Sequence, residues 1–260
     1  MDNLYIIKIG GNIIDDKEKL SSFLKAFASI PHRKLLVHGG GKLATNLAEQ
    51  MNIPQQMVDG RRITDAETLK VVTMVYAGYI NKSIVAQLQA YDCNAIGLSG
   101  ADANVLQAHK RQKGNIDFGY AGDIDSVDAF FLHQLLEQEL TPVLCPITHD
   151  RKGQLLNTNA DTIAQESGKA LSRFYTVHLV YSFEKSGVLR NADDDDSVIT
   201  EINAGSYHDL KEQKVVFAGM IPKLDNAFAA LESGVKEVII GKAEDILELV
   251  SGKAGTRIVG

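Results

Sequence analysis

The sequence predicts an α/β protein in which a mostly parallel sheet is covered by helices on both faces. Strand-like apolar runs alternate with segments of helical periodicity along the whole chain, and this order is typical of parallel sheets. Glycine-rich turns follow several of the strands, at the edge where ligands of such sheets bind. The 260 residues, 45% of them hydrophobic, suffice for one large domain or two small lobes.

Each expected strand is a short run rich in β-branched and aliphatic residues. The strands are Leu4–Ile9, Lys34–His38, Ala95–Leu98, Pro142–Ile147, Phe174–Val180 and Val235–Ile240. Between them, apolar residues that recur about every 3.6 residues predict helices. These are Lys17–Ala28, Leu43–Met51, Asp65–Ala90, Val127–Gln138, Ala160–Leu171 and Lys223–Glu232. The polar, glycine-containing segment Asp102–Asp125 is expected to leave the sheet as a hairpin.

The composition argues against several classes of function. A net charge of -6 and a pI near 5.6 do not favour a general nucleic-acid-binding surface. No apolar run approaches the ~20 residues of a membrane span, and the first strand starts at the N-terminus with no signal peptide before it. Cys93 and Cys145 lie in apolar stretches without metal-ligand spacing, so we expect reduced core cysteines. The four-aspartate run Asp193–Asp196 is expected to be a solvated turn. We therefore expect a cytoplasmic protein without nucleic-acid or membrane partners.

The first strand ends in Lys8-Ile9-Gly10-Gly11. The two glycines let a ligand approach the backbone closely, and backbone N–H groups beside a lysine suit an anion such as phosphate. A plain glycine turn with the lysine reaching solvent explains the same residues equally well. Repetition of the motif elsewhere in the chain decides between the two.

The motif recurs at the end of the second strand, as His38-Gly39-Gly40-Gly41-Lys42 before a helix. Three glycines at a helix N-terminus make a second anion cradle. This is not a Walker A loop, because Leu43 follows the lysine, and no Gly-x-Gly-x-x-Gly motif of a dinucleotide fold occurs.

Three further turns carry polar groups at helix starts. Gly219-Met220-Ile221-Pro222-Lys223 places a proline and a lysine in a first helical turn, where a cation is unfavourable unless an anion binds. Asn157-Thr158-Asn159-Ala160-Asp161 offers an N-cap in Asn159, together with an aspartate that could orient a lysine or hold Mg²⁺. Gly60-Arg61-Arg62-Ile63-Thr64-Asp65 offers arginines for bidentate capture of a carboxylate, or a solvated charge pair. The turn Ser99-Gly100-Ala101-Asp102 is a weaker signal of the same kind.

In their order, these motifs and the terminal Gly255-Thr256-Arg257-Ile258 resemble the amino acid kinase family, over about residues 4–260. The Gly-x-Arg-x-Thr turn, taken with Asn-x-Asn-Ala-Asp, is similar to the acetylglutamate branch of that family. The resemblance implies a three-layer α/β/α sandwich around an open, mainly parallel sheet. It also implies an acylglutamate-binding N-terminal lobe (about 1–172) with the dimer contact, and an ATP-binding C-terminal lobe (about 173–260). The implied reaction transfers the γ-phosphoryl group of MgATP to the γ-carboxylate of N-acetyl-L-glutamate, in arginine biosynthesis.

The resemblance also implies roles for single residues. Arg62 and Asn157 would bind the α-carboxylate end of the substrate, with Asn159 beside them, and the N–H groups of Gly40 and Gly41 would face the reacting groups. Lys8 and Lys223 would contact the phosphoryl group from opposite sides, with Asp161 holding both. The implied phosphate- and ATP-binding residues are Gly10, Gly11, Glu184, Gly187 and Gly219. Magnesium would arrive with ATP rather than on protein ligands, and His38 would be a structural residue at the strand end.

Departures from the family pattern leave alternatives open. Phe183-Glu184-Lys185-Ser186-Gly187 stands where the family usually has an Asp-Val-x-Gly turn, so Glu184 would replace the aspartate. The same anchors would serve a kinase for another N-acylglutamate, such as N-succinylglutamate, or a non-catalytic metabolite sensor. Retention of both lysines and Asp161 favours an enzyme over a sensor. Because Lys8 lies so near Met1, we expect an arginine-insensitive homodimer without the extra N-terminal helix of arginine-inhibited members.

Overall fold

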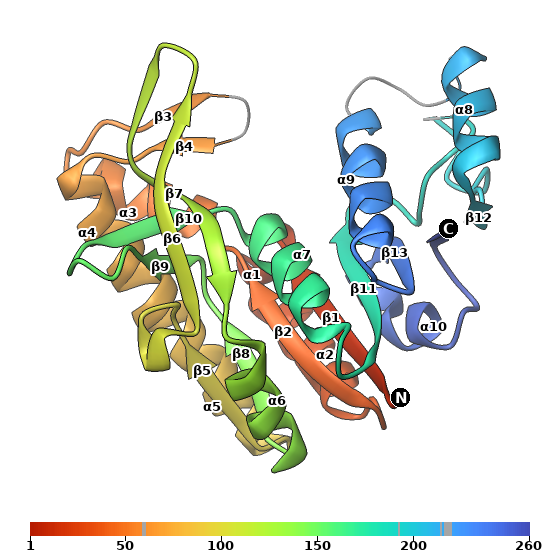
Figure 1. The fold of residues 1–260 in the computed structure, drawn as a ribbon, viewed down its shortest axis with the longest axis horizontal. Coiled ribbons are helices and arrows are strands. Elements are labelled where there is room, and N and C mark those ends of the chain that lie inside the picture. Colours follow the sequence, from red (N-terminus) through yellow and green to blue (C-terminus); the bar gives the residue numbers. More distant parts are fainter. Residues whose placement is uncertain (59–60, 192, 214, 216–219) are drawn as a thin grey trace.

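The computed structural model describes residues 1–58, 61–191, 193–213, 215 and 220–260. Its main sheet has eight strands in the order β12-β14-β13-β11-β1-β2-β8-β5, and all neighbouring pairs are parallel except β13 with β14 (Figure 1). The bounds are β1 Asn3–Ile9, β2 Arg33–His38, β5 Ala95–Leu98, β8 Thr141–Leu144, β11 Thr176–Phe183, β12 Glu201–Ile202, β13 Glu237–Lys242 and β14 Thr256–Val259. The predicted mostly parallel sheet is confirmed.

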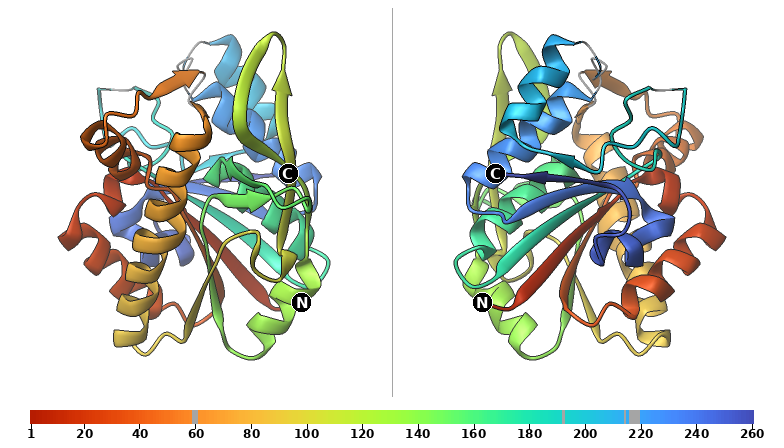
Figure 2. Two further views of the ribbon diagram at one scale, coloured as in Figure 1. Left: turned by 90° about the vertical axis from the view of Figure 1, so that its left-hand side faces the viewer. Right: turned by 90° about the vertical axis from the view of Figure 1, so that its right-hand side faces the viewer.

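Helices cover both faces of this sheet, as the side views of Figure 2 show. One face packs against α2 (Lys17–Ala28), α3 (Gly41–Gln50), α4 (Ala66–Thr73), α5 (Asn81–Ala90) and α10 (Ile246–Val250). The other packs against α6 (Ala129–Glu137), α7 (Ala160–Leu171), α8 (Ala204–Glu212) and α9 (Ile221–Glu232). Alternate residues of β1 feed the two cores: Leu4 and Ile6 point to one, Tyr5 and Ile7 to the other. The result is three layers, with helices on each side of the sheet.

A second sheet of four strands, closed into a small barrel, stands above the carboxyl edge of β8. It joins β10 (Leu155–Thr158), β7 (Ile116–Val127), β6 (Leu106–Lys113) and β9 (Ile147–His149). The long β6–β7 hairpin projects beyond the rest of the molecule (Figure 1), which confirms the hairpin expected between Asp102 and Asp125. A short pair, β3 (Gln56–Val58) and β4 (Arg61–Ile63), lies beside it, and Thr64 just after β4 bonds to the backbone of β7.

Two predicted elements were wrong in detail. The single strand expected at Pro142–Ile147 is divided between β8 and β9, because Pro146 lies between them and the chain passes there into the second sheet. The single α-helix expected at Asp65–Ala90 is α4 and α5 joined by a π-helical segment, Met74–Ile80. By contrast, α2 and α7 have the predicted bounds, since Asp16 and Asn159 cap their first turns through side-chain oxygens.

The remaining helical pieces are short. They are α1 (Gly11–Ile14) and the 3₁₀ turns Asp102–Asn104 and Ala243–Asp245. Both cysteines are buried and free, as expected, and Asp193–Asp196 are exposed residues of a turn region. Across the described ranges, none of the helices is long and apolar enough to cross a membrane.

Candidate active site at the carboxyl edge of the sheet

Two adjoining cavities open where β1, β2 and β11 end. The smaller, about 240 Å³, is lined by the glycines of both predicted cradles and by Arg62 and Asn157. The larger, about 420 Å³, is lined by residues from β11, α7 and α9 and by the β6–β7 hairpin. Four residues line both cavities: Lys8, Arg61, Asn159 and Asp161. The two spaces therefore meet at one wall that carries two cations and one carboxylate.

An ion pair forms the centre of this shared wall. Lys8 Nζ lies 2.8 Å from Asp161 Oδ1, and the lysine side chain is 17% exposed while the aspartate is 50% exposed. Lys8 is the next-to-last residue of β1, and Asp161 lies in the first turn of α7, where the helix dipole favours a negative charge. Tyr181 from β11 donates to the backbone carbonyl of Asp161 at 3.4 Å. The lysine is thus held with its ammonium toward the junction of the two cavities.

Lys223 faces the larger cavity from the start of α9. Its Nζ lies 3.7 Å from the centroid of the Phe183 ring. Burial lowers the pKa of Lys223, and the charge of Lys8 lowers it further, whereas Asp161 and Glu184 act in the opposite direction. Lys8 and Lys223 therefore feel each other's charge, and an anion between them would relieve that repulsion. Of the two predicted contacts of Asp161, the described residues contain the ion pair with Lys8 and none with Lys223.

The glycine cradles are close-fitting. Gly40 has φ +141°, and a Cβ there would overlap Ile80 Cδ1 and lie 3.3 Å from Tyr76 Cδ1, so only glycine fits. Gly10 and Gly41 are the N-cap of α1 and the first residue of α3. A Cβ on Gly10 would lie 3.9 Å from Lys8 Nζ, and one on Gly41 would lie 3.7 Å from Arg62 Nη2. Gly11 lines the smaller cavity beside them. Side chains at these positions would enter the space around the cationic groups.

Arg62 is anchored in the wall of the smaller cavity. It is 8% exposed and donates from Nη2 to Gly41 O at 3.0 Å and to Thr45 Oγ1 at 2.9 Å, while Nη1 donates to Gln55. Asn157 lies on β10 and donates to Thr64 Oγ1 at 3.1 Å. These bonds fix both side chains before any ligand binds, which lowers the entropic cost of binding.

Asn159 is explained first by its capping role. Its Oδ1 accepts from the backbone N–H groups of Asp161 at 2.8 Å and Thr162 at 3.1 Å. These bonds satisfy N–H groups that the first helical turn leaves without partners. Asn159 also lines both cavities, so the cap holds the carboxylate of Asp161 at the shared wall.

The sequence named Arg61 only as one of the paired arginines of its turn, without a role of its own, and it did not single out the cations of the hairpin. Arg61 neighbours Arg62 on β4, and both line the smaller cavity, but only Arg61 of the two also lines the larger one. Its Nη2 lies 3.4 Å from Thr162 Oγ1 and its Nη1 lies 3.9 Å from Asp123 Oδ1. Burial lowers the pKa of Arg61, and so does the charge of Arg111, whereas Asp123 and Asp161 act in the opposite direction. The Arg-Arg pair was the available signal, since both of its side chains line the smaller cavity.

Arg111 and Lys113 of β6 also line the larger cavity. Arg111 Nη1 donates to both oxygens of Asp123, at 2.6 and 2.9 Å. With Lys8, Lys223 and Arg61, they give the larger cavity five cationic side chains and the carboxylate of Asp161 among its described lining residues. Such a lining suits a polyanion.

Two of the predicted nucleotide contacts stand apart from these cavities. Glu184 and Gly187 line neither cavity. A Cβ on Gly187 would lie 2.7 Å from Thr256 Oγ1, so close packing against β14 already accounts for that glycine. Gly219 lies outside the described residues, as does Gly60 of the arginine turn.

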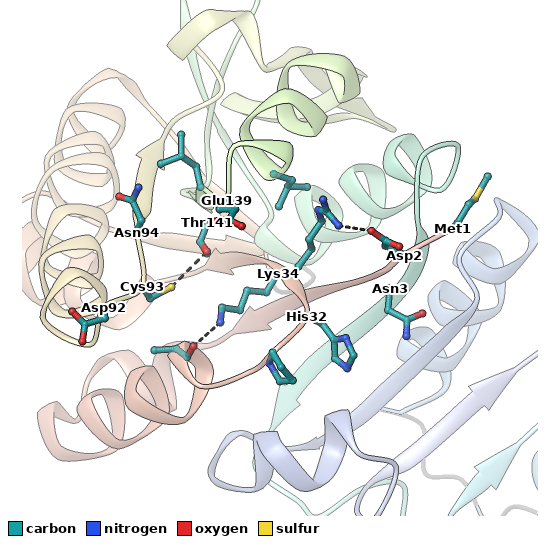
Figure 3. A pocket seen from close by; sticks show the side chains of 15 residues that line it. Met1, Asp2, Asn3, His32, Lys34, Asp92, Cys93, Asn94, Glu139 and Thr141 are labelled. Atoms are coloured by element: carbon teal, nitrogen blue, oxygen red, sulfur yellow. Dashed lines mark hydrogen bonds and ion pairs between the residues drawn. The ribbon is translucent and has the colours of Figure 1, made fainter.

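The largest of the described cavities, about 710 Å³, lies at the opposite edge of the sheet, around His32, Arg33 and Lys34 (Figure 3). Its cations already have partners. Arg33 pairs with Asp2 at 2.5 Å and with Glu137 at 3.1 Å, and Lys34 Nζ donates to the carbonyls of Ala28 and Ile30 at 2.6 and 2.8 Å. Size alone therefore does not identify the site, and the carboxyl edge has the better-placed charges.

Comparison with known proteins identifies the family of the chain. The model of the amino acid kinase family matches residues 3–242. The acetylglutamate kinase of Cytophaga hutchinsonii is 56% identical, over 100% of this chain and 99% of its own. That of Parabacteroides distasonis is 52% identical, over 99% and 100%.

Among solved structures, N-acetylglutamate synthase from Neisseria gonorrhoeae has a TM-score of 0.83 at 21% identity, with 100% of this chain and 59% of that chain covered. That likeness concerns the fold alone. The full-length relatives, at more than 50% identity, show the family itself: the chain belongs to the amino acid kinase family and, within it, to the acetylglutamate kinases.

Proposed function

We propose that this protein transfers the γ-phosphoryl group of MgATP to the γ-carboxylate of N-acetyl-L-glutamate, giving N-acetyl-L-glutamyl 5-phosphate. The observation that carries the proposal is the meeting of two cavities at the Lys8–Asp161 pair. One cavity has the groups for a dicarboxylate, and the other has the cations for a triphosphate. A phosphoryl group that passes between them must pass Lys8.

The chemistry needs no general base. A carboxylate is already ionised near pH 7, so its oxygen can attack the γ-phosphorus while the bond to the β-phosphate oxygen breaks and ADP leaves. The main obstacle is repulsion between the carboxylate and the triphosphate. Positioning and charge neutralisation supply most of the rate enhancement in such transfers. A wall of lysines, arginines and glycine N–H groups is therefore sufficient machinery.

In this proposal the smaller cavity binds the acylglutamate and the larger cavity binds the nucleotide phosphates. Arg62 and Asn157 hold the α-carboxylate in the smaller cavity, and the N–H groups of Gly40 and Gly41 face the reacting γ-carboxylate. Lys223 faces Lys8 from the nucleotide side and contacts the transferring group. Asp161 orients Lys8 through the 2.8 Å ion pair. Gly10 and Gly11 let the phosphates approach the backbone at the end of β1.

Magnesium would enter with the nucleotide. It would neutralise charge on the β- and γ-phosphates. At the shared wall Asp161 is the single carboxylate among the described lining residues, and it is already paired with Lys8. A hard cation that prefers six oxygen ligands would thus take most of them from phosphates and water.

The lining of the cavities also supports two lobes. Every described residue that lines the smaller cavity precedes position 172, whereas the larger cavity is also lined by residues after it, among them Tyr181, Phe183, Lys223 and Ile240. We accordingly assign the acylglutamate to the lobe of residues 1–172 and ATP to that of residues 173–260. A homodimer remains a prediction, which sedimentation equilibrium would test.

Trapping of the product with hydroxylamine tests the proposed function. Hydroxylamine converts an acyl phosphate into a hydroxamate, so we expect MgATP-dependent hydroxamate with N-acetyl-L-glutamate and little with glutamate or aspartate. Turnover of glutamate or aspartate at the same kcat/KM would contradict the assignment. A protein that binds the acylglutamate without forming hydroxamate would instead be a sensor.

The position of Arg61 supports one alternative substrate, an N-acylglutamate whose acyl group bears a carboxylate, such as N-succinylglutamate. The acetylated substrate has two carboxylates, for which Arg62 with Asn157 and the glycine N–H groups suffice. Arg61 adds a cation to the same cavity. If it binds a third carboxylate, Arg61→Leu lowers kcat/KM for N-succinylglutamate much more than for N-acetylglutamate. An equal loss for both substrates would assign Arg61 to the phosphates instead.

A further inference from the structure

His38 ends β2 directly before the glycines of the smaller cavity, and its side chain is completely buried. Its Nδ1 lies 2.8 Å from the carbonyl oxygen of Gly39. A carbonyl oxygen only accepts hydrogen bonds, so Nδ1 must carry the proton. Burial keeps the ring neutral, with a pKa lowered to about 4. The tautomer of His38 is therefore Nδ1–H with a bare Nε2.

Asn81 accounts for the bare nitrogen. Asn81 Nδ2 lies 3.2 Å from His38 Nε2 and donates to it, and it also donates to Val143 O at 3.0 Å. Asn81 Oδ1 accepts from Lys82 Nζ at 3.1 Å. Each donor in this chain thus faces an acceptor, and the network admits one tautomer of the histidine. Asn81 is 1% exposed, so solvent does not compete for these bonds.

The hydrogen bond from His38 to Gly39 O also determines the direction of the next backbone N–H, that of Gly40. Gly39 C=O and Gly40 N–H belong to one planar trans unit and point in opposite directions. Because the carbonyl is turned toward buried His38, the Gly40 N–H points away from the histidine, and Gly40 itself lines the smaller cavity together with Gly39 and Gly41. In the described part of the chain, no backbone carbonyl accepts from this N–H.

The π-helical segment directly before Asn81 also restricts the residue type at Gly40. Ile80 and Tyr76 pack against Gly40, where any Cβ would overlap Ile80. Gly39 N–H, in turn, donates to Ile9 O of β1 at 3.1 Å. The loop is thus held at Gly39 N–H by β1, at Gly39 C=O by His38, and at Gly40 by the π-helical segment.

We propose that His38 is a positioning residue for the phosphoryl transfer: its Nδ1–H holds the Gly39 carbonyl so that Gly40 N–H faces the reacting anion, and Asn81 fixes the tautomer. The proposal rests on the proposed kinase function. A preorganised N–H aimed at developing negative charge acts mainly in the transition state. Its loss should therefore lower kcat more than it raises KM.

A matched pair of substitutions separates positioning from packing. His38→Asn keeps an N–H donor at the δ position, within reach of Gly39 O, whereas His38→Gln offers its amide at the ε position, toward Asn81. We expect His38→Asn to retain kcat within about threefold and His38→Gln to lose about 10- to 100-fold, with the KM for N-acetylglutamate little changed in both. A purely structural histidine would make the two variants equal, or would lower kcat in proportion to lost stability, and either result overturns the proposal.

A second measurement does not depend on the variants folding. In ¹⁵N NMR spectra of the wild-type protein at neutral pH, the His38 ring must show the neutral Nδ1–H form; an Nε2–H form would refute the mechanism. Wild-type hydroxamate formation is measured in the same series. If the wild type is inactive, the proposed function fails and this role fails with it. If the wild type is active and the variants do not differ, only the role of His38 is refuted.

Discussion

Replacement of Lys8 by methionine tests the shared wall most simply, because it removes the charge and keeps most of the side-chain volume. The ion pair with Asp161 is short, at 2.8 Å, but the aspartate is 50% exposed and can be solvated when the lysine is gone. Pairs of this exposure contribute about 0–1 kcal/mol to stability. The free energy of unfolding should therefore change little.

The kinetic effect should be much larger. Loss of one preorganised group that stabilises transition-state charge costs about 10²- to 10³-fold in kcat. We expect Lys8→Met to lower kcat by that factor while the KM for ATP stays within about threefold, since the other cations of the larger cavity remain. The assay follows ADP release by a coupled enzyme reaction, together with thermal unfolding of each variant.

Lys70→Met is the matched control. It removes an exposed ion pair with Glu67, of 2.6 Å, on the surface of α4, and should change neither kcat nor stability appreciably. A Lys8→Met enzyme with kcat close to that of the control would refute the catalytic role of Lys8. A loss of activity that only follows a large loss of stability would refute it as well.

Three further perturbations test other parts of the site. Gly40→Ala should lower the free energy of unfolding by about 2–5 kcal/mol, through backbone strain at φ +141° and overlap with Ile80. The control Gly252→Ala, at φ +73° with open space around it, should lower it by less than half as much, as measured by urea unfolding. Arg62→Ala should raise the KM for N-acetylglutamate about 10- to 100-fold, because charge-assisted bonds to the α-carboxylate are lost; an unchanged KM rules out that contact. The folded-state pKa of His38, about 4, lies below its ordinary value of 6.5, so the unfolded chain takes up the proton first and stability falls as pH drops below about 6.5. Relative to His38→Asn, the free energy of unfolding of the wild type should fall by about 2 kcal/mol between roughly pH 8 and pH 5. Parallel plots of that free energy against pH for the two proteins would contradict the lowered pKa.

The fold was predictable to the extent that local signals decide it. Asp16 and Asn159 cap α2 and α7, and both helices have the predicted bounds. The π-helical segment Met74–Ile80 was not predictable, because apolar periodicity does not distinguish one extra residue in a turn from a regular helix. The passage of the chain between two sheets at Pro146 was missed for a similar reason: the apolar run continues through it.

The site was predictable where sequence motifs are contiguous. Lys8, Gly40 and Asp161 come from three separate motifs, and the parallel sheet brings their strand ends and helix starts together. Arg61 and Arg111 needed the structure, because they reach the larger cavity from two hairpins whose packing no local pattern reveals. The network of His38 with Asn81 joins residues 43 positions apart, and only the fold shows that they meet.

Transfer of oxygen from substrate to phosphate tests the central claim most directly. N-acetyl-L-glutamate labelled with ¹⁸O in its γ-carboxylate is incubated with MgATP and enzyme, and the product is cleaved with hydroxylamine, which attacks the acyl carbon and releases phosphate. If the γ-carboxylate attacks phosphorus at the Lys8–Asp161 wall, the released phosphate carries one ¹⁸O atom in its mass spectrum. Phosphate without label would mean that water, not the carboxylate, accepts the phosphoryl group, and would contradict the account.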